Sequence, residues 1–160
     1  MEKKKVVLAF SGGLDTSFCV PYLKNEKGLE VHTIMVNTGG FSAEEEKAIE
    51  TRALTLGAAS HKNVNAVETY YSKGIRYLIY GNILKNATYP LSVSSERVFQ
   101  ALEVLKHVKE LGADAVAHGS TGAGNDQVRF DIVFEILAPE VKIIAPVRDE
   151  GFTRQFEIDF

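Results

Sequence analysis

The segment Val6-Val-Leu-Ala-Phe10, followed directly by Ser11-Gly-Gly-Leu-Asp-Thr-Ser17, decides the fold of this chain. The first five residues are a continuous apolar run rich in β-branched side chains, which predicts a strand covered on both faces. The two glycines break the run, and Asp15, Thr16 and Ser17 are residues that favour the start of a helix. A covered strand that leads straight into a helix is typical of a parallel α/β sheet.

Strands and helices alternate along the rest of the chain. Further strands are predicted at residues 29–36, 58–67, 113–117 and 141–147. Helices are predicted at residues 43–56, 67–80, 94–111 and 127–137, with a loop around residues 88–90 and the opening of a last helix at 154–160. This alternation predicts the α/β class: a doubly wound, mostly parallel, Rossmann-like sheet with helices on both faces.

Capping signals define several helix ends. Ser42 and Glu45 have the spacing of a capping box at the start of the helix 43–56. Gly57 and Gly112 follow helical segments and are expected to stop them. Pro21 lies within the first helical segment and predicts a kink or a late helix start, because a proline inside a helix removes a hydrogen bond.

Composition restricts the class of protein but not its chemistry. The chain has 160 residues, close to the roughly 150 of one domain. Its 18 lysines and arginines against 21 acidic residues give a net charge of −3, which provides no strong basic field for nucleic acid. Cys19 is the one cysteine, so neither an internal disulfide nor a thiolate metal cluster can form. Apolar runs are too short for a membrane helix or a signal peptide, so we expect a soluble cytoplasmic protein with no nucleic-acid or membrane partner.

The first glycine-rich turn, residues 11–17, has the properties of an anion site. Adjacent glycines allow the main chain to approach a ligand closely, and free N–H groups at a helix N-terminus favour negative charge. The hydroxyls of Ser11, Thr16 and Ser17 add donors. The turn is neither a Walker A loop nor a Gly-x-Gly-x-x-Gly motif. Because Asp15 would repel a bare phosphate, it either caps the helix or faces a bridging Mg²⁺.

A second glycine-rich loop, residues 118–126, follows another predicted strand and is therefore expected at the same edge of the sheet. Arg129 can bind a carboxylate with two hydrogen bonds, Asp126 can accept from an ammonium group, and Asn125 can do either. Together these residues suit a zwitterion such as an amino acid. The alternative is a surface loop followed by a helix that Asn125 or Asp126 caps.

The whole string of residues 11–17 resembles the pyrophosphate-binding loop of the ATP pyrophosphatases, the adenine nucleotide alpha hydrolase-like or PP-loop superfamily. Those enzymes split ATP into AMP and pyrophosphate while activating an oxygen. Within that superfamily, three segments resemble the argininosuccinate synthases: residues 9–17, 89–97 and 118–130. The sequence departs from the pattern of this family at two places. Phe10 stands where many members have tyrosine. The loop of residues 37–42 replaces a Gly-Gln ending that is commoner in the family, and this change concerns the contacts expected with adenine.

The resemblance implies a role for each matching residue. The implied ATP contacts are Ala9, Phe10, Ser11, Gly12, Gly13, Leu14, Asp15, Thr16 and Ser17, together with Val36 against adenine and Gly119 against the nucleotide. The implied citrulline contacts are Tyr89, Ser94, Asn125 and Arg129, and the implied aspartate contacts are Thr121, Asn125 and Asp126. Asp15, Asp126 and Arg129 are the candidate catalytic residues, with Asp126 orienting a substrate ammonium group.

The implied activity is an ATP-dependent ligation of citrulline and aspartate in arginine biosynthesis, with Mg²⁺ neutralising the leaving pyrophosphate. Members of this family are longer homotetramers held largely by C-terminal elements. We therefore expect residues 1–160 to be a truncated nucleotide-binding domain that lacks the synthetase and tetramerisation part and is inactive alone.

Two other functions compete with this reading. The fold and the first loop would also suit a nucleotide-binding module without turnover. A third possibility is another PP-loop enzyme that adenylates a different acceptor. Glutamine-dependent relatives carry a glutaminase domain and a nucleophilic cysteine near the start, and tRNA-thiolating relatives need further cysteines. The lone Cys19, expected as a core thiol, matches neither.

Overall fold

The computed structural model describes residues 3–160 and contains one five-stranded sheet in which every neighbouring pair is parallel. The spatial order is β3-β2-β1-β6-β7. The strands are β1 (Lys5–Ala9), β2 (Glu30–Asn37), β3 (Ser60–Asn65), β6 (Ala115–His118) and β7 (Lys142–Ile144). The chain runs outward from β1 to β3 and then returns to the other side of β1, so the topological switch point lies between β1 and β6. The predicted doubly wound parallel sheet is confirmed.

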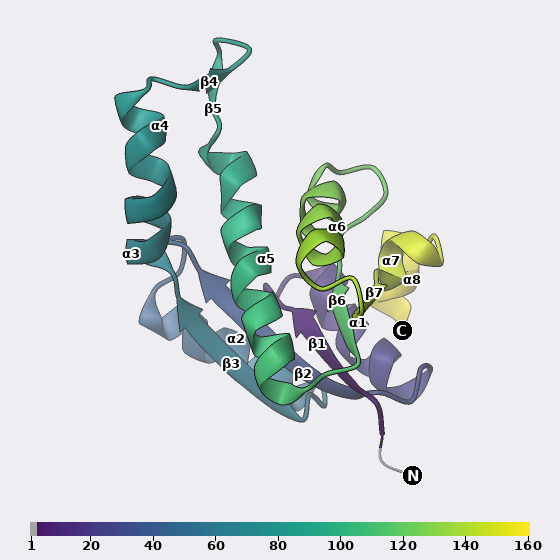
Figure 1. Cartoon of the computed structure of the whole chain (residues 1–160). Helices are drawn as coiled ribbons and strands as arrows, with labels where there is room; N and C mark the ends of the chain where they lie inside the picture. The colour runs from purple at the N-terminus through teal and green to yellow at the C-terminus, as the bar shows by residue number, and fades with distance from the viewer. Residues whose placement is uncertain (1–2) are drawn as a thin grey trace.

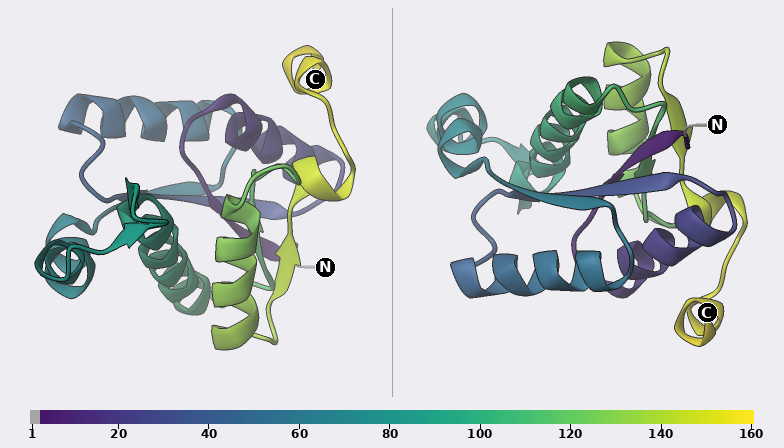
Figure 2. Two further views of the ribbon diagram at one scale, coloured as in Figure 1. Left: turned by 90° about the horizontal axis from the view of Figure 1, so that it is seen from above. Right: turned by 90° about the horizontal axis from the view of Figure 1, so that it is seen from below.

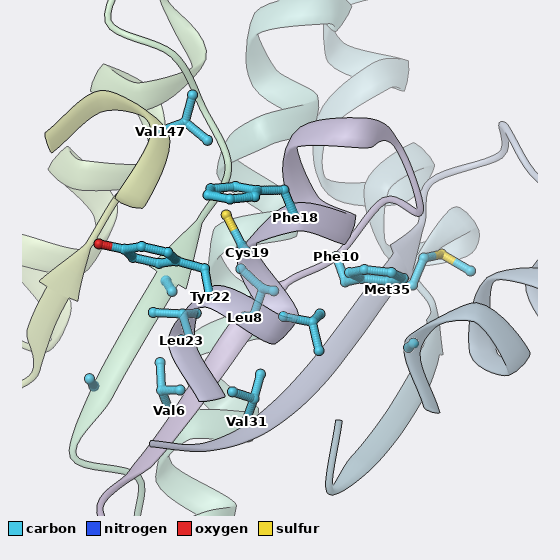
Figure 3. Close-up of a cluster of buried hydrophobic side chains, with 14 of the residues drawn as sticks. Val6, Leu8, Phe10, Phe18, Cys19, Tyr22, Leu23, Val31, Met35 and Val147 are labelled. Atoms are coloured by element: carbon cyan, nitrogen blue, oxygen red, sulfur yellow. The ribbon is translucent and has the colours of Figure 1, made fainter. Parts of the chain in front are cut away.

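Helices cover both faces of this sheet (Figure 2). On one face, α1 (Leu14–Asn25) and α2 (Ala43–Thr55) enclose a core that includes Phe18, Leu23 and Met35 (Figure 3). On the other face, α5 (Ser92–Leu111) and α6 (Asp126–Leu137) enclose a second core. Burial on both faces explains why residues 6–9 of β1 and 115–117 of β6 are uninterrupted apolar runs in the sequence. Within residues 3–160, no helix combines the length and the apolar character needed to cross a membrane.

The first helix differs from the sequence-based expectation in where it begins. Gly13 is the N-cap of α1 and Leu14 its first residue, so Asp15 lies in the first turn and is not the cap. Of the two outcomes expected at Pro21, a kink or a late start, the late start is wrong, because α1 begins at Leu14 and continues through that proline to Asn25. The predicted capping box is confirmed: Glu45 N donates to Ser42 Oγ at 3.3 Å, and Ser42 N donates to Glu45 Oε2 at 2.8 Å.

The segment between β3 and α5 projects away from the sheet (Figure 1). The helix predicted over residues 67–80 is divided into α3 (Val67–Tyr70), a π-helical turn η1 (Tyr71–Ile75) and α4 (Arg76–Tyr80). The expected loop around residues 88–90 contains a small antiparallel hairpin of β4 (Leu84–Lys85) and β5 (Tyr89–Pro90). This hairpin joins the outer ends of α4 and α5, so side chains on it lie far along the projection.

The end of the chain returns to the first helix. The strand predicted over 141–147 is shorter than expected, because Pro146 opens α7 (Pro146–Asp149), and proline is well suited to the first turn of a helix. The expected helix near the C-terminus is present as α8 (Arg154–Asp159), which Thr153 caps. α8 packs on α1 through aromatic rings: the Phe18 centroid lies 5.1 Å from that of Phe160 and 6.0 Å from that of Phe156.

Candidate functional site

A cavity of about 670 Å³ opens at the carboxyl ends of β1, β2 and β6, beside the switch point. This volume falls within the range of small-molecule sites, and ligands in doubly wound sheets bind at this edge. Four parts of the chain form most of the lining: the first glycine-rich turn, the end of β2 with the loop after it, residues 96–104 of α5, and the second glycine-rich loop. The two loops that sequence analysis singled out therefore share one cavity.

The first turn presents its main chain to this cavity. Gly12 has a φ of 75°, a conformation that favours glycine. The carbonyl oxygen of Gly13 accepts from Ser17 N at 2.9 Å and from Thr16 Oγ1 at 3.2 Å, which anchors the turn to the first turn of α1. The N–H groups at the start of α1 have no intrahelical acceptors. They are available to an anion in the cavity.

Sequence reasoning missed the cation that lies against this turn. Arg52, on α2, donates from NH1 to the carbonyl oxygen of Gly12 at 2.5 Å. Arg52 also lines a smaller pocket together with Ser11 and other residues of α2. The turn itself contains no lysine or arginine, and α2 therefore supplies the positive charge. Only the tertiary fold joins positions 12 and 52, and the local sequence carries no signal for the contact.

The second loop packs directly on the first. A Cβ at Gly119 would lie 3.0 Å from Thr16 Cγ2 and 3.1 Å from Thr16 N, so glycine is required for this close approach. Thr121 and Gly124 also line the cavity. The start of α1 and the loop after β6 therefore form one continuous wall.

A charged network joins the end of the second loop to α5 and α6. Asp126 accepts from Arg97 Nε at 3.0 Å and from Arg129 NH1 at 2.6 Å, and Arg129 NH2 also donates to Ser94 Oγ at 3.0 Å. Partial burial would raise the pKa of Asp126, but the two guanidinium groups outweigh it and hold that pKa below its usual value. Arg97 also lies 3.4 Å from Glu96. The network thus holds an ionised carboxylate between two arginines at the cavity rim.

The end of β2 provides an apolar wall. Ile34, Met35 and Val36 are buried and line the cavity, and Gly40 and Phe41 extend this wall into the following loop. Asn37 orders that loop: its side-chain amide donates to Phe41 O at 2.8 Å, and its Oδ1 accepts from Gly39 N at 2.8 Å. This is the segment in which the sequence departs from the pattern of the family it resembles.

Not all the singled-out residues line the cavity. Those that do are Ala9, Phe10, Ser11, Gly13, Leu14, Asp15, Thr16, Val36, Gly119, Thr121 and Asp126. Gly12, Ser17, Ser94 and Arg129 are not part of the lining. Ser17 and Arg129 reach it through their hydrogen bonds to Gly13 and Asp126, and Ser94 is hydrogen-bonded to Arg129. Asn125 is the exposed N-cap of α6, where its side chain makes no capping hydrogen bond. Tyr89 lies on the projecting hairpin, outside the cavity lining.

A buried carboxyl from α8 lies beside Asp15. Glu157 is 7% exposed, and its Oε2 has no hydrogen-bond partner among the described residues. Burial, and after it the neighbouring Asp15, raise the pKa of Glu157. Cys19 is fully buried in the same region, as expected of a core thiol, and burial raises its pKa as well. Sequence reasoning assigned no role to Glu157, because nothing near residue 157 indicates that α8 packs on α1.

The fold and the cavity define a Rossmann-like α/β domain of the HUP type. The family model described as "Arginosuccinate synthase N-terminal HUP domain" matches residues 5–160. The chain is 46% identical over 149 residues to the argininosuccinate synthase of Xanthomonas campestris pv. campestris, which covers 93% of this chain and 37% of that protein. It is 43% identical over 160 residues to the argininosuccinate synthase of Pyrobaculum aerophilum, which covers 100% of this chain and 40% of that protein.

The chain therefore belongs to the argininosuccinate synthase N-terminal domain family. It spans about two fifths of the length of the curated relatives it matches. Among solved structures, it resembles the predicted subunit of a tRNA methyltransferase from Methanocaldococcus jannaschii, with a TM-score of 0.61 and 20% identity over 98% of this chain and 73% of that one. At that identity the likeness concerns the fold alone.

Proposed function

We propose that this chain binds ATP and forms the nucleotide site and part of the amino-acid site of a ligase that joins citrulline to aspartate. The products would be argininosuccinate, AMP and pyrophosphate, as part of arginine biosynthesis. Family membership supports the proposal. The observation that carries it is that the main-chain anion site of residues 11–16 and the ionised Asp126 line the same cavity. An anion and a zwitterion could therefore meet there.

The cavity and the residues around it would bind three parts of the substrates. The turn at residues 11–17 would hold the phosphates, with Arg52 supplying the positive charge from behind. The apolar wall at Val36 would contact adenine, and Gly119 would lie against the nucleotide. The citrulline contacts would be Tyr89, Ser94, Asn125 and Arg129, and the aspartate contacts Thr121, Asn125 and Asp126.

The reaction would proceed in two displacements. The ureido oxygen of citrulline would attack the α-phosphorus of ATP and release pyrophosphate, and the amino group of aspartate would then attack the activated carbon and release AMP. The chain's contribution would be to bring the groups together and to stabilise charge. Asp126, held ionised by Arg97 and Arg129, would orient an ammonium group and not take a proton.

The side chains near the turn fit Mg²⁺. Mg²⁺ bound to nucleotides is usually held by one or two carboxylates, the phosphates and water. Asp15, which lines the cavity, and the buried Glu157 beside it, whose Oε2 lacks a partner among residues 3–160, would provide such a pair of oxygen ligands. When bound there, Mg²⁺ would neutralise the charge of the leaving pyrophosphate.

We also propose that residues 1–160 are the nucleotide-binding domain of a longer cytoplasmic protein, which acts as a homotetramer. The relatives' remaining length, about three fifths, would contain the synthetase and tetramerisation parts. The domain alone would then bind ATP without completing the reaction. Steady argininosuccinate formation by these 160 residues would contradict this assignment.

Titration calorimetry with ATP and Mg²⁺ tests the nucleotide assignment on this chain. We expect saturable binding with one site, and its absence would refute the proposal. In the full-length protein, pyrophosphate release should depend on citrulline, and AMP release on aspartate. Pyrophosphate release that is indifferent to citrulline would indicate a PP-loop enzyme with another acceptor. ATP binding without any pyrophosphate release would indicate a binding module.

Replacing Arg129 by lysine (Arg129→Lys) should reduce citrulline-dependent pyrophosphate release by the full-length protein about tenfold or more. A lysine cannot hold Asp126 and Ser94 at once in the planar geometry of arginine, and a hydrogen bond to a charged group contributes about 1.5–3 kcal/mol. ATP affinity should change little. The matched control is Arg76→Lys on α4, an exposed arginine outside the cavity. Equal rates in both variants would contradict the assignment.

A further inference from the structure

His118, the last residue of β6, is a buried histidine whose two ring nitrogens both have partners. It is 1% exposed, and its ring stacks on Phe130 with centroids 5.6 Å apart. Nδ1 lies 3.2 Å from Ser120 N, and Nε2 lies 2.9 Å from Asp131 Oδ1. A backbone N–H can only donate, so Nδ1 must accept, and the ring hydrogen must be on Nε2 and point at Asp131. The contacts define a single neutral tautomer.

Asp131 is itself held in place from the far side. Arg148 NH1 donates to Asp131 Oδ2, and Arg148 Nε donates to Asp149 Oδ1 at 2.9 Å. Asp149 Oδ2 in turn accepts from Ala145 N at 3.0 Å, at the point where β7 ends. The chain of contacts therefore runs from the second loop through α6 to α7 and the end of β7. It fixes both the position and the tautomer of the imidazole.

The amide that His118 binds belongs to the wall of the cavity. Ser120 lines the cavity between Gly119 and Thr121. Gly119 is in turn packed against Thr16 so closely that a Cβ would meet its backbone nitrogen at 3.1 Å. Holding Ser120 N therefore sets where the second loop meets the start of α1.

We infer that His118 is a positioning residue for the nucleotide site, which fixes residues 119–121 against the first turn by accepting a hydrogen bond from Ser120 N. Asp131, Arg148 and Asp149 keep His118 in the tautomer that this contact needs. His118 need not touch the ligand to act in this way. The consequence for ATP rests on the proposed function, whereas the positioning of the loop does not.

The contact carries a pH dependence. Burial lowers the pKa of His118 below 6.5. The carboxylates of Asp131 and Asp149 act to raise this pKa, and the guanidinium of Arg148 acts to lower it, but burial has the largest effect. Protonation would place a hydrogen on Nδ1, facing the N–H of Ser120, and the contact would be lost. Because the unfolded chain binds this proton at a higher pH than the folded chain, the contribution of His118 to stability is complete above pH 6.5 and declines as the pH falls below it.

Two amide variants separate the two ring nitrogens. In His118→Asn, the side-chain oxygen can occupy the position of Nδ1 and accept from Ser120 N. In His118→Gln, the longer side chain reaches toward Asp131 and leaves Ser120 without its acceptor. Both variants are polar, and the thermal unfolding midpoint is measured first to establish that each is folded. The readout is the hydrogen-exchange rate of the Ser120 amide by NMR, with the Val116 amide of β6 as the internal reference.

We expect His118→Gln to accelerate exchange at Ser120 about tenfold relative to His118→Asn, with Val116 unchanged, as for the loss of one hydrogen bond. ATP should bind His118→Gln about tenfold more weakly than His118→Asn. As the pH falls through the folded-state pKa of His118, which lies below 6.5, the wild-type affinity should fall relative to that of His118→Asn. The titration of ATP itself cancels in this ratio.

Equal exchange at Ser120 in the two variants would overturn the inference. So would equal ATP affinities of His118→Gln and His118→Asn, provided that the wild-type protein binds ATP. If the exchange rates differ as expected but no form of the protein binds ATP, the proposed function fails and the positioning of the loop by His118 stands.

Discussion

Gly12→Val is expected to weaken ATP binding at least about thirtyfold. Gly12 has a φ of 75°, where a residue with a Cβ is strained by roughly 1–2 kcal/mol. The added Cβ would also lie 3.0 Å from Ile49 Cγ1, and overpacking of this kind costs about 1–3 kcal/mol. Relief of that strain would move the turn and its N–H groups away from the phosphates. Since about 1.4 kcal/mol corresponds to tenfold in affinity, a loss of 2 kcal/mol gives the expected change.

Gly28→Val is the matched control for this experiment. Gly28 has a similar φ of 66°, but no atom lies within 4 Å of the position that its Cβ would take. It follows α1 and precedes β2, at the edge of the sheet away from the cavity. The control should lose stability from backbone strain and keep its ATP affinity. Calorimetry on both variants measures the difference, and equal affinities would mean that the turn at residues 11–17 does not contact the nucleotide.

The sequence was sufficient to predict the sheet and the first turn, because both depend on local chemistry. A run such as residues 6–10 is compatible with a covered strand, and two adjacent glycines followed by residues that favour a helix start indicate a tight turn into a helix. The second loop was also predicted at the correct edge, because parallel strands align their carboxyl ends. The predicted start of α1 was wrong by one residue or more. The polar residues at positions 15–17 indicated the start, but Gly13 is the N-cap and the helix already includes Leu14.

The residues that sequence analysis missed all act across long separations in the chain. Arg52 reaches Gly12 from α2, Arg97 reaches Asp126 from α5, and Glu157 reaches Asp15 from α8. Each of these side chains lies on a helix whose local pattern is that of an ordinary charged surface. The tertiary packing of α2, α5 and α8 brings these side chains to their partners. Helix periodicity indicates which face is buried, but it does not indicate which partner a charged residue meets at the rim.

The tertiary packing of α6 links the core to the charged network, because this helix presents Asp126 and Arg129 at one end and Phe134 near the other. Phe134 is fully buried in the core between α5, α6 and the sheet, with its ring centroid 5.7 Å from that of Phe130. Phe130 is also the ring on which His118 stacks. Removal of the Phe134 ring should therefore affect both the stability of the domain and the position of the site residues.

Phe134→Ala should lower the free energy of unfolding by about 3–5 kcal/mol, the usual effect of removing a buried phenyl ring. Ile136→Ala is the control on the same helix: Ile136 is 69% exposed, so its truncation should change stability by less than about 0.5 kcal/mol. Urea unfolding followed by circular dichroism measures both. The ATP affinity of Phe134→Ala is measured at a temperature at which the same unfolding experiment shows that the variant is folded. Similar losses in the two variants would mean that α6 does not pack on the sheet as described, and the contacts of Asp126 and Arg129 would then lack their support.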